Sequence, residues 1–255
     1  MIDQALKDRL VSGTSVLVLR CARADMTSTN GFRWPESGEA SAPDFIATKT
    51  CGNGLHGWLW GAGGITSCNY WSDEGVRWLV VEVLAADVID LDGKIKFPRG
   101  TVVLCGTRDQ AVALITEHAP PGTAIMFGTA TAGDSGTATA GYSGTATAGY
   151  SGTATAGDRG TATAGDRGTA TAGYSGTATA GDSGTATAGY SGTATAGDSG
   201  TATAGDRGTI AIRYYDAKAD RYRVAVADVD SDGNIKPNTA YIVVDGKLVA
   251  KDGAK

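Results

Sequence analysis

The chain has 255 residues, of which 38 are glycine, and its formal net charge at pH 7 is −5. Lysine and arginine form no cluster along it, so the charge pattern predicts neither a nucleic-acid partner nor an anionic membrane partner. The longest apolar run, residues 78–84 (WLVVEVL), is too short to span a bilayer and contains Glu82, which argues against a membrane segment.

The first ten residues mix acidic and basic side chains and lack the continuous apolar core of a secretory signal. The four cysteines, Cys21, Cys51, Cys68 and Cys105, have neither the density of a disulfide scaffold nor the paired spacing of a structural zinc site. We therefore expect a cytoplasmic protein with reduced thiols, no metal and no cofactor.

Residues 1–121 predict a small α+β domain. Short β-branched runs bounded by Gly, Pro or Asp are typical of strands, and they occur at residues 15–19, 77–84 and 101–105. Thr107 is placed to cap a helix over residues 108–118, which Pro120 and Pro121 then end.

The middle of the chain consists of ten octads between residues 128 and 207, each reading G-T-A-T-A-G-x-x. The seventh place is Asp or Tyr, and the eighth is Ser or Arg. A fixed period of this kind indicates a repeat architecture. The alternation T-A-T-A predicts a strand with one threonine face and one alanine face, and G-x-x-G predicts a turn at each corner.

One octad extends to only about 26 Å, which is too short to close a coil that has two strands and an interior. Two octads per coil predict a flattened parallel β-solenoid of about five coils, with two sheets whose strands are about 4.8 Å apart. We assign residues 122–213 to this solenoid and its capping strands.

The ends of the repeats suggest which face is buried. Residues 208–213 (GTIAIR) continue the octad register with Ile210 and Ile212 in the places of alanines, which favours an alanine face that points inward. Residues 125–127 (IMF) are expected to close the other end, because solenoids need atypical terminal units. Threonine inside, with ladders of hydroxyl groups, is the alternative.

Residues 214–255 predict a β-rich cap. The stretch from Asp228 to Gly233 has the D-x-D-x-D-G start of a calcium loop, but position twelve is Thr239 and the predicted neighbours are strands. An acidic turn without an ion is the preferred interpretation, and calcium binding stays open.

With alanine inside, the threonines form flat arrays of hydroxyl and methyl groups that could face water, ice or a partner. Their members are Thr129, Thr131, Thr137, Thr139, Thr145, Thr147, Thr153, Thr155, Thr161, Thr163, Thr169, Thr171, Thr177, Thr179, Thr185, Thr187, Thr193, Thr195, Thr201 and Thr203. The sixteen-residue coil, the Thr-x-Thr pairs and the Gly, Ser and Tyr corners resemble the repeats of bacterial ice-nucleation proteins. That resemblance implies a threonine lattice able to order water.

These arrays allow three interpretations. The main hypothesis is a non-enzymatic repeat protein that acts as a structural or self-associating module, for which two threonine sheets could dock face to face into a homodimer. The alternative is a surface that binds ice or ordered water; with about five coils we expect weak adsorption rather than nucleation. Threonine could also serve only as a good strand former on a solvated sheet.

Tyrosines at the corners could stack between coils. Tyr142, Tyr174 and Tyr190 fall on the even octads and Tyr150 on an odd one, so Tyr174 and Tyr190 are expected to lie directly above one another. In ice-nucleation repeats a corner tyrosine looks like a dimerising ladder; local ring packing is the alternative.

The most ligand-like patch before the repeats is residues 51–57 (CGNGLHG), because glycines around His56 allow close backbone approach. The segment resembles an uncharacterised domain at the front of phage-encoded and bacterial repeat proteins. An enzymatic alternative likens His56 to the nicotinamide-binding histidine of ADP-ribosyltransferases, with Tyr70 and with Glu74 or Glu82. Zinc binding by Cys51, His56 and Cys68 lacks a fourth ligand. A structural histidine is the preferred interpretation.

Overall fold

The computed structural model describes residues 2–65, 68–230 and 233–253. The chain divides into two compact units, Met1–Met126 and Phe127–Lys255. None of the described helices is long and apolar enough to cross a membrane.

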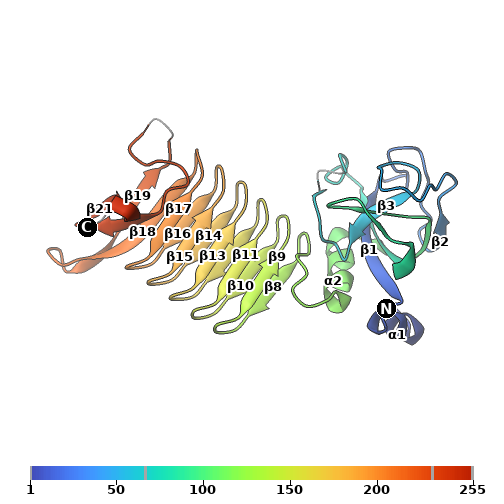
Figure 1. Ribbon diagram of the computed structural model, residues 1–255, viewed down its shortest axis with the longest axis horizontal. Helices are drawn as coiled ribbons and strands as arrows, with labels where there is room; N and C mark the ends of the chain where they lie inside the picture. The colour runs from blue at the N-terminus through green and yellow to red at the C-terminus, as the bar shows by residue number, and fades with distance from the viewer. Residues whose placement is uncertain (1, 66–67, 231–232, 254–255) are drawn as a thin grey trace. The chain divides into compact units, whose positions relative to one another are not determined.

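The first unit contains a seven-stranded antiparallel sheet with the strand order β2-β7-β4-β1-β3-β6-β5. Figure 1 labels β1, β2 and β3 of this sheet and the helices α1 and α2. Its strands are β1 (Ser15–Ala22), β2 (Gly38–Ser41), β3 (Leu55–Leu59), β4 (Arg77–Leu84), β5 (Ile89–Asp90), β6 (Ile95–Phe97) and β7 (Arg99–Gly106). Its helices are α1 (Gln4–Val11), α2 (Arg108–His118) and a 3-10 turn at Ala85–Asp87. The central strands β1 and β4 are almost wholly buried.

The predicted α+β class is confirmed, and the predicted strands lie in β1, β4 and β7. Thr107 caps α2, as the sequence indicates, and the structure adds a capping box with Gln110. Helix α2 packs on β1, β4 and β7 through Ala111, Val112 and Ile115. Helix α1 and the strands β2, β3, β5 and β6 were not predicted, since their sequences are short or rich in glycine.

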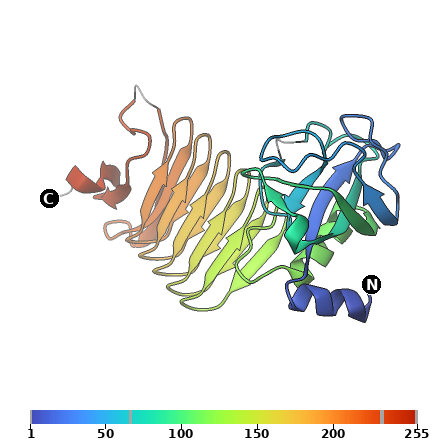
Figure 2. The ribbon, with the colours of Figure 1, turned by 45° about the vertical axis from the view of Figure 1, so that its right-hand side comes forward.

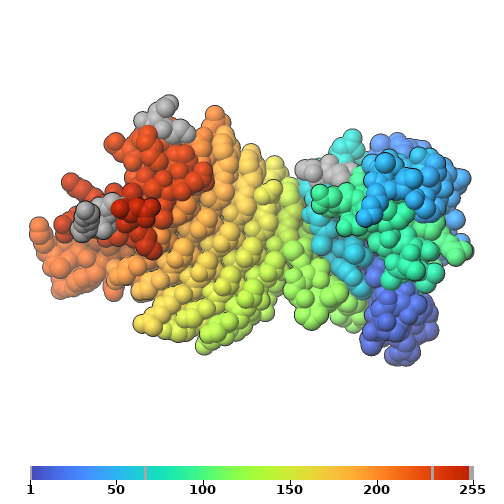
Figure 3. Space-filling view, in the orientation of Figure 1, coloured from blue at the N-terminus to red at the C-terminus, as the bar shows by residue number. Residues whose placement is uncertain are grey.

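The second unit contains the predicted β-solenoid (Figures 1 and 2). Its ten short strands are β8 (Thr129–Ala132), β9 (Thr137–Ala140), β10 (Thr145–Ala148), β11 (Thr153–Ala156), β12 (Thr161–Ala164), β13 (Thr169–Ala172), β14 (Thr177–Ala180), β15 (Thr185–Ala188), β16 (Thr193–Ala196) and β17 (Thr201–Ala204). Alternate strands pair in parallel, so that Thr145 lies opposite Thr129 and Thr153 opposite Thr137. This register confirms two octads per coil and about five coils, which Figure 3 shows as parallel rows.

Alanine methyl groups fill the interior of the solenoid. From Ala138 to Ala204 the alanines of the strands are at most 4% exposed, whereas nearly all of the repeat threonines are half-buried or exposed. Ile210 and Ile212 extend the buried face, opposite Ala194 and Ala196. The alternative with threonine inside is therefore wrong.

Each corner is a tight G-x-x-G turn closed by a backbone hydrogen bond, such as Gly160 N–H to Gly157 O at 3.0 Å. The eighth residue of the octad adopts a left-handed conformation, with φ between 50° and 58°, although it is Ser or Arg rather than Gly. A bond to the next coil helps to hold it there: Ser143 N–H donates to Asp158 O at 2.8 Å.

The sixth-place glycines are required by the spacing of the coils. A Cβ on Gly165 would lie 2.9 Å from the carbonyl carbon of Gly149 and 3.0 Å from the backbone nitrogen of Tyr150, both in the preceding coil. The corresponding Gly133 belongs to the first coil, and a Cβ there would meet nothing within 4 Å.

The C-terminal cap is β-rich, as expected. The sheet that contains β8 continues into the antiparallel hairpin of β18 (Thr209–Asp216) and β19 (Arg221–Asp228). The sheet that contains β9 continues into β20 (Tyr241–Val244) and β21 (Lys247–Ala250), followed by a 3-10 turn at Lys251–Gly253. Val229 and Tyr241 are buried against the last alanines and isoleucines.

The N-terminal end of the solenoid differs from the expectation. Met126 N–H donates to Gly61 O at 3.0 Å and Ile125 bridges to Ala62, so both residues are part of the first unit. Only Phe127 belongs to the second unit, where its ring meets Tyr142 edge-on at 5.7 Å.

The close approach of the coils predicts a position-specific effect of alanine at the corners. Gly165→Ala is expected to lower the free energy of unfolding of the solenoid by about 1–3 kcal/mol, because the added methyl group must displace backbone. Gly133→Ala, the matched control in the first coil, is expected to stay within about 0.5 kcal/mol of the wild type. Thermal or urea unfolding followed by circular dichroism measures both, and equal losses would contradict the stacking geometry.

Candidate functional site

The repeat threonines lie on two outward faces. The β8 face carries those of β8, β10, β12, β14 and β16, and the β9 face carries those of β9, β11, β13, β15 and β17. On the β8 face, Thr129, Thr131, Thr145 and Thr147 are all exposed. The β9 face is partly covered at its end, where Thr201 is only 8% exposed and lies 3.5 Å from Lys251 Nζ.

Both faces are rigid and regular because backbone bonds tie each coil to the next. Thr145 N–H donates to Gly128 O at 2.9 Å, and Thr153 N–H donates to Gly136 O at 2.8 Å. In the described part of the chain, Lys251 at Thr201 is the sole protein group that bonds a hydroxyl of the repeat threonines. The other hydroxyls are therefore free to bind water.

At the corners, aspartate and tyrosine connect neighbouring coils in different ways. Asp158 Oδ1 accepts a hydrogen bond from Tyr174 N–H of the next coil at 2.9 Å. The rings of Tyr174 and Tyr190 are parallel, with centroids 5.6 Å apart. Aspartate and tyrosine therefore both help to hold together the stack of corners, which we call the corner column.

Corner arginines lie over tyrosine rings. The Arg167 guanidinium is 5.8 Å from the ring centre of Tyr150, and that of Arg207 is 5.7 Å from Tyr190. Each of these pairs joins two successive coils by a cation–π contact worth roughly 0.5–1 kcal/mol at an exposed site.

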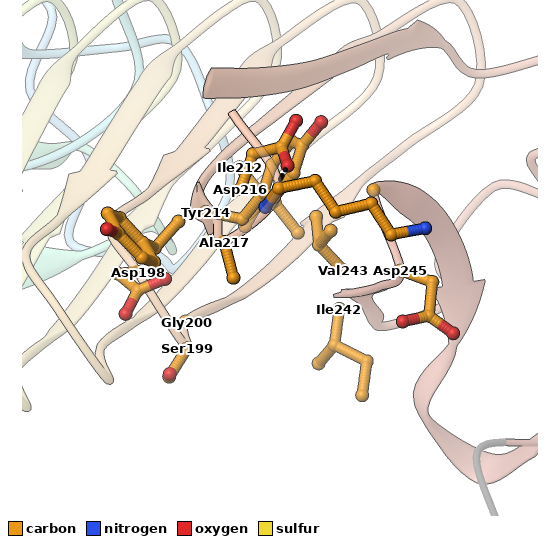
Figure 4. A pocket seen from close by; sticks show the side chains of 13 residues that line it. Asp198, Ser199, Gly200, Ile212, Tyr214, Asp216, Ala217, Ile242, Val243 and Asp245 are labelled. Carbon is orange, nitrogen blue, oxygen red and sulfur yellow. Dashed lines mark hydrogen bonds between the residues drawn. The ribbon is translucent and has the colours of Figure 1, made fainter. Parts of the chain in front are cut away.

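A groove of about 840 Å³ opens where the last coil meets the two C-terminal hairpins (Figure 4). Asp198 and Ser199 form one side, and Ile242 and Val243 lie on the other. Nearby, the Arg213 guanidinium bonds both carboxylate oxygens of Asp182, at 2.8 and 2.9 Å, and so joins β18 to the corner column.

His56 lies on β3 at the edge of a second pocket, which Arg20, Cys51 and Lys94 also line. Its Nε2 accepts a weak hydrogen bond from Gly52 N–H at 3.4 Å. Burial, followed by the positive charges of Lys94, Arg20 and Lys96, lowers the pKa of His56 to about 4. The imidazole is therefore neutral near pH 7.

The partners of the enzymatic alternative do not gather around His56. Tyr70 accepts a hydrogen bond from Arg20 Nη2 at 2.8 Å. Glu82 instead forms an ion pair with Arg9, whose Nε is 2.6 Å from Oε1, and Glu74 is exposed. Tyr70 thus contacts Arg20, which lines the pocket of His56, whereas Glu82 pairs with Arg9 and does not line that pocket.

Both units have counterparts among known sequences. Residues 16–113 match a family described as a domain of unknown function, DUF7666. An ice nucleation protein of Xanthomonas campestris pv. translucens is 51% identical over 120 residues, which is 46% of this chain and 8% of that protein. One from Pseudomonas syringae pv. syringae is 37% identical over 117 residues, 45% of this chain and 10% of that protein. Ice nucleation protein InaU of Pantoea ananas is 36% identical over 105 residues, 40% of this chain and 10% of that protein.

The chain therefore spans about a tenth or less of the length of these relatives. No solved structure matches it significantly. Together with the solenoid, the matches confirm the resemblance of the octads to ice-nucleation repeats and show a tandem-repeat protein.

The cysteines are not arranged around His56. Cys51 is exposed and shares its pocket, whereas Cys68 is buried against Cys21, with the two sulfur atoms 2.8 Å apart. The described residues contain no group of three or more His, Cys, Asp or Glu side chains that could hold a metal ion. The calcium-loop-like stretch from Asp228 to Gly233 includes residues 231 and 232, which lie outside the described residues.

Sequence reasoning missed most of the pocket around His56. Arg20 comes from β1, Trp34 from a loop, and Lys94 from the turn before β6. These residues are too far apart in the sequence to form a helical or strand repeat or a short motif, so the sequence alone could not show that they share a pocket.

The electrostatics of His56 predict an acid-sensitive contribution to stability. Because its folded pKa of about 4 is below the ordinary value of 6.5, the unfolded chain binds more protons between these two values. The free energy of unfolding should therefore fall as the pH decreases through this window, and less steeply in His56→Gln.

Two measurements check this prediction. The imidazole resonance of His56, assigned with His56→Gln and His118→Gln, should titrate near pH 4, and denaturant unfolding at several pH values should show the difference in slope. An imidazole midpoint close to 6.5 would contradict the argument.

Proposed function

We propose that the protein binds ice, or the ordered water at an ice surface, through the threonine faces of its solenoid. The observation that carries this proposal is the in-register display of Thr-x-Thr pairs on a rigid, alanine-filled scaffold. The matching relatives named ice nucleation proteins support it.

The physical argument rests on repetition. Successive threonines along a strand are about 6.7 Å apart, and equivalent threonines of adjacent coils about 4.8 Å apart. Each hydroxyl can bond water, and each methyl group leaves its neighbouring water molecules bonded mainly to one another. Many weak contacts then act together, and little entropy is lost because the backbone is already ordered.

The size of the array sets the expected strength. About five coils form a small lattice, and the chain spans about a tenth or less of the length of the ice nucleation proteins that it matches. Adsorption to existing ice, seen as slower recrystallisation or weak thermal hysteresis, is therefore the expected activity, and nucleation of ice is not.

Paired substitutions on one face test this function. Thr161→Lys with Thr177→Lys places two long, charged side chains on the β8 face. Thr169→Lys with Thr185→Lys does the same on the β9 face. The wild type at micromolar concentration should inhibit ice recrystallisation. At least one pair should reduce that inhibition severalfold, because lysine disrupts the flat array.

The control is Thr48→Lys, an exposed threonine in the first unit, which should leave the inhibition unchanged. Circular dichroism verifies that each variant is folded. Inhibition absent from the wild type, or equal in all variants, would contradict ice binding by the threonine faces.

Self-association is the second candidate, and the hairpin β18–β19 favours it. Tyr222, Val224 and Val226 on β19 are 56–60% exposed, on an edge strand with unpaired backbone groups. They lie opposite residues of β18 that continue the outward register of the β8 face, where Thr209 aligns with Thr193. A second copy related by a two-fold axis could pair with this edge and cover the patch.

Val226→Lys tests self-association. It should convert a dimer of the wild type to a monomer in light scattering after size exclusion, since it places a charge in the patch that the dimer would bury. Val244→Lys, at an exposed position on the other sheet, is the matched control and should remain dimeric. A monomeric wild type across the micromolar range would overturn this candidate.

A further inference from the structure

The pocket beside His56 has the dimensions and lining of a small-molecule site. Its volume is about 480 Å³, within the range of roughly 300–1,000 Å³ that such sites occupy. Phe32, Trp34 and Leu55 contribute an apolar wall, and Arg20, Lys94 and His56 contribute the polar groups.

Two buried donors in the wall of this pocket have no acceptor. Arg20 Nε and Trp34 Nε1 are shielded from solvent, and neither has a hydrogen-bond partner in the described part of the chain. Trp34 itself is only 3% exposed. Buried polar atoms almost always have partners, and both of these can only donate.

Arg20 and Lys94 line the pocket together with a single carboxylate, that of Asp44, so positive charge is in excess there. Neither Arg20, Lys94 nor Lys96 forms a salt bridge among the described residues. Lys96 is fully buried and donates to the carbonyl oxygens of Thr50, at 2.9 Å, and Gly52, at 3.4 Å. Burying a cation without a counter-charge is costly, so an anion in the pocket would be stabilised.

The aromatic wall indicates the rest of the ligand. Phe32 and Trp34 meet edge to face with ring centres 5.3 Å apart, and the Arg20 guanidinium lies 5.8 Å from the centre of the Trp34 ring. Arg20 is also held by Tyr70, so its charge has a defined position. Flat apolar surface next to a fixed cation suits a ring that bears an anionic group.

We propose that this pocket binds a small aromatic anion, a ring bearing a carboxylate or phosphate group, with the anionic oxygens directed to Arg20 and Lys94 and the ring packed on Phe32 and Trp34. This site is separate from the threonine faces, and its failure or success leaves the ice-binding proposal untouched.

Four probes in two matched pairs test the proposal on the full-length protein. Benzoate is compared with benzamide, and AMP with adenosine, by isothermal calorimetry and by the shift of thermal unfolding. We expect at least one anion to bind and to raise the unfolding temperature, and its neutral counterpart to bind at least tenfold more weakly. Binding of AMP alone identifies a phosphate ligand, and binding of benzoate alone identifies a carboxylate.

Variants then place the binding in this pocket. Arg20→Gln and Lys94→Gln should each weaken the binding of whichever anion binds the wild type at least tenfold. Trp34→Phe, which keeps a smaller aromatic ring at this position, should also weaken it. Arg33→Gln, an exposed arginine outside the pocket, should leave it unchanged. If Arg20→Gln does not fold, Lys94→Gln decides the question. No binding of either anion, equal binding of the neutral probes, or unchanged affinity in Lys94→Gln would overturn the proposal.

Discussion

The stacking of each coil on the backbone sixteen residues earlier is the constraint on which the repeat unit depends. It brings successive coils so close that a single Cβ at Gly165 would meet backbone of the preceding coil. The interior is equally narrow, since methyl groups of alanine fill it from one sheet to the other. Glycine at the corner and alanine inside are therefore requirements of space, and they account for four of the six places that never change.

The same constraint produces the regular surface. Once alanine is buried, the intervening threonines must point outward, and parallel pairing in register repeats them in every coil. The seventh and eighth places vary because they lie outside the strands. Aspartate bonds the next coil through its carboxylate, as at Asp158, and tyrosine does so by ring stacking, as at Tyr174. Variation at the corners thus leaves the threonine lattice undisturbed.

The two units divide the chemistry of the protein. The solenoid presents hydroxyl and methyl groups over large faces, a surface suited to many weak contacts. The first unit gathers Arg20 and Lys94 around one pocket, where burial, followed by the nearby positive charges, lowers the pKa of His56. With that pKa the imidazole carries no charge near pH 7, and the surrounding positive charges favour an anion nearby. A pocket rich in positive charge and a flat lattice of threonines thus occur in one chain without sharing any residue.

The sequence by itself determined the repeat unit, from the strand faces to the two-octad coil and the inward alanines that Ile210 and Ile212 revealed. It also determined α2, through the N-cap at Thr107 and the two prolines that follow the helix. Only the tertiary structure assigned Ile125 and Met126 to the first unit and brought Arg20, Trp34 and Lys94 to one pocket. The reason is the range of the contacts: each coil touches neighbours of the same sequence, so a local period specifies the solenoid. The order of strands in the antiparallel sheet, in contrast, depends on pairings between distant segments that no local pattern encodes.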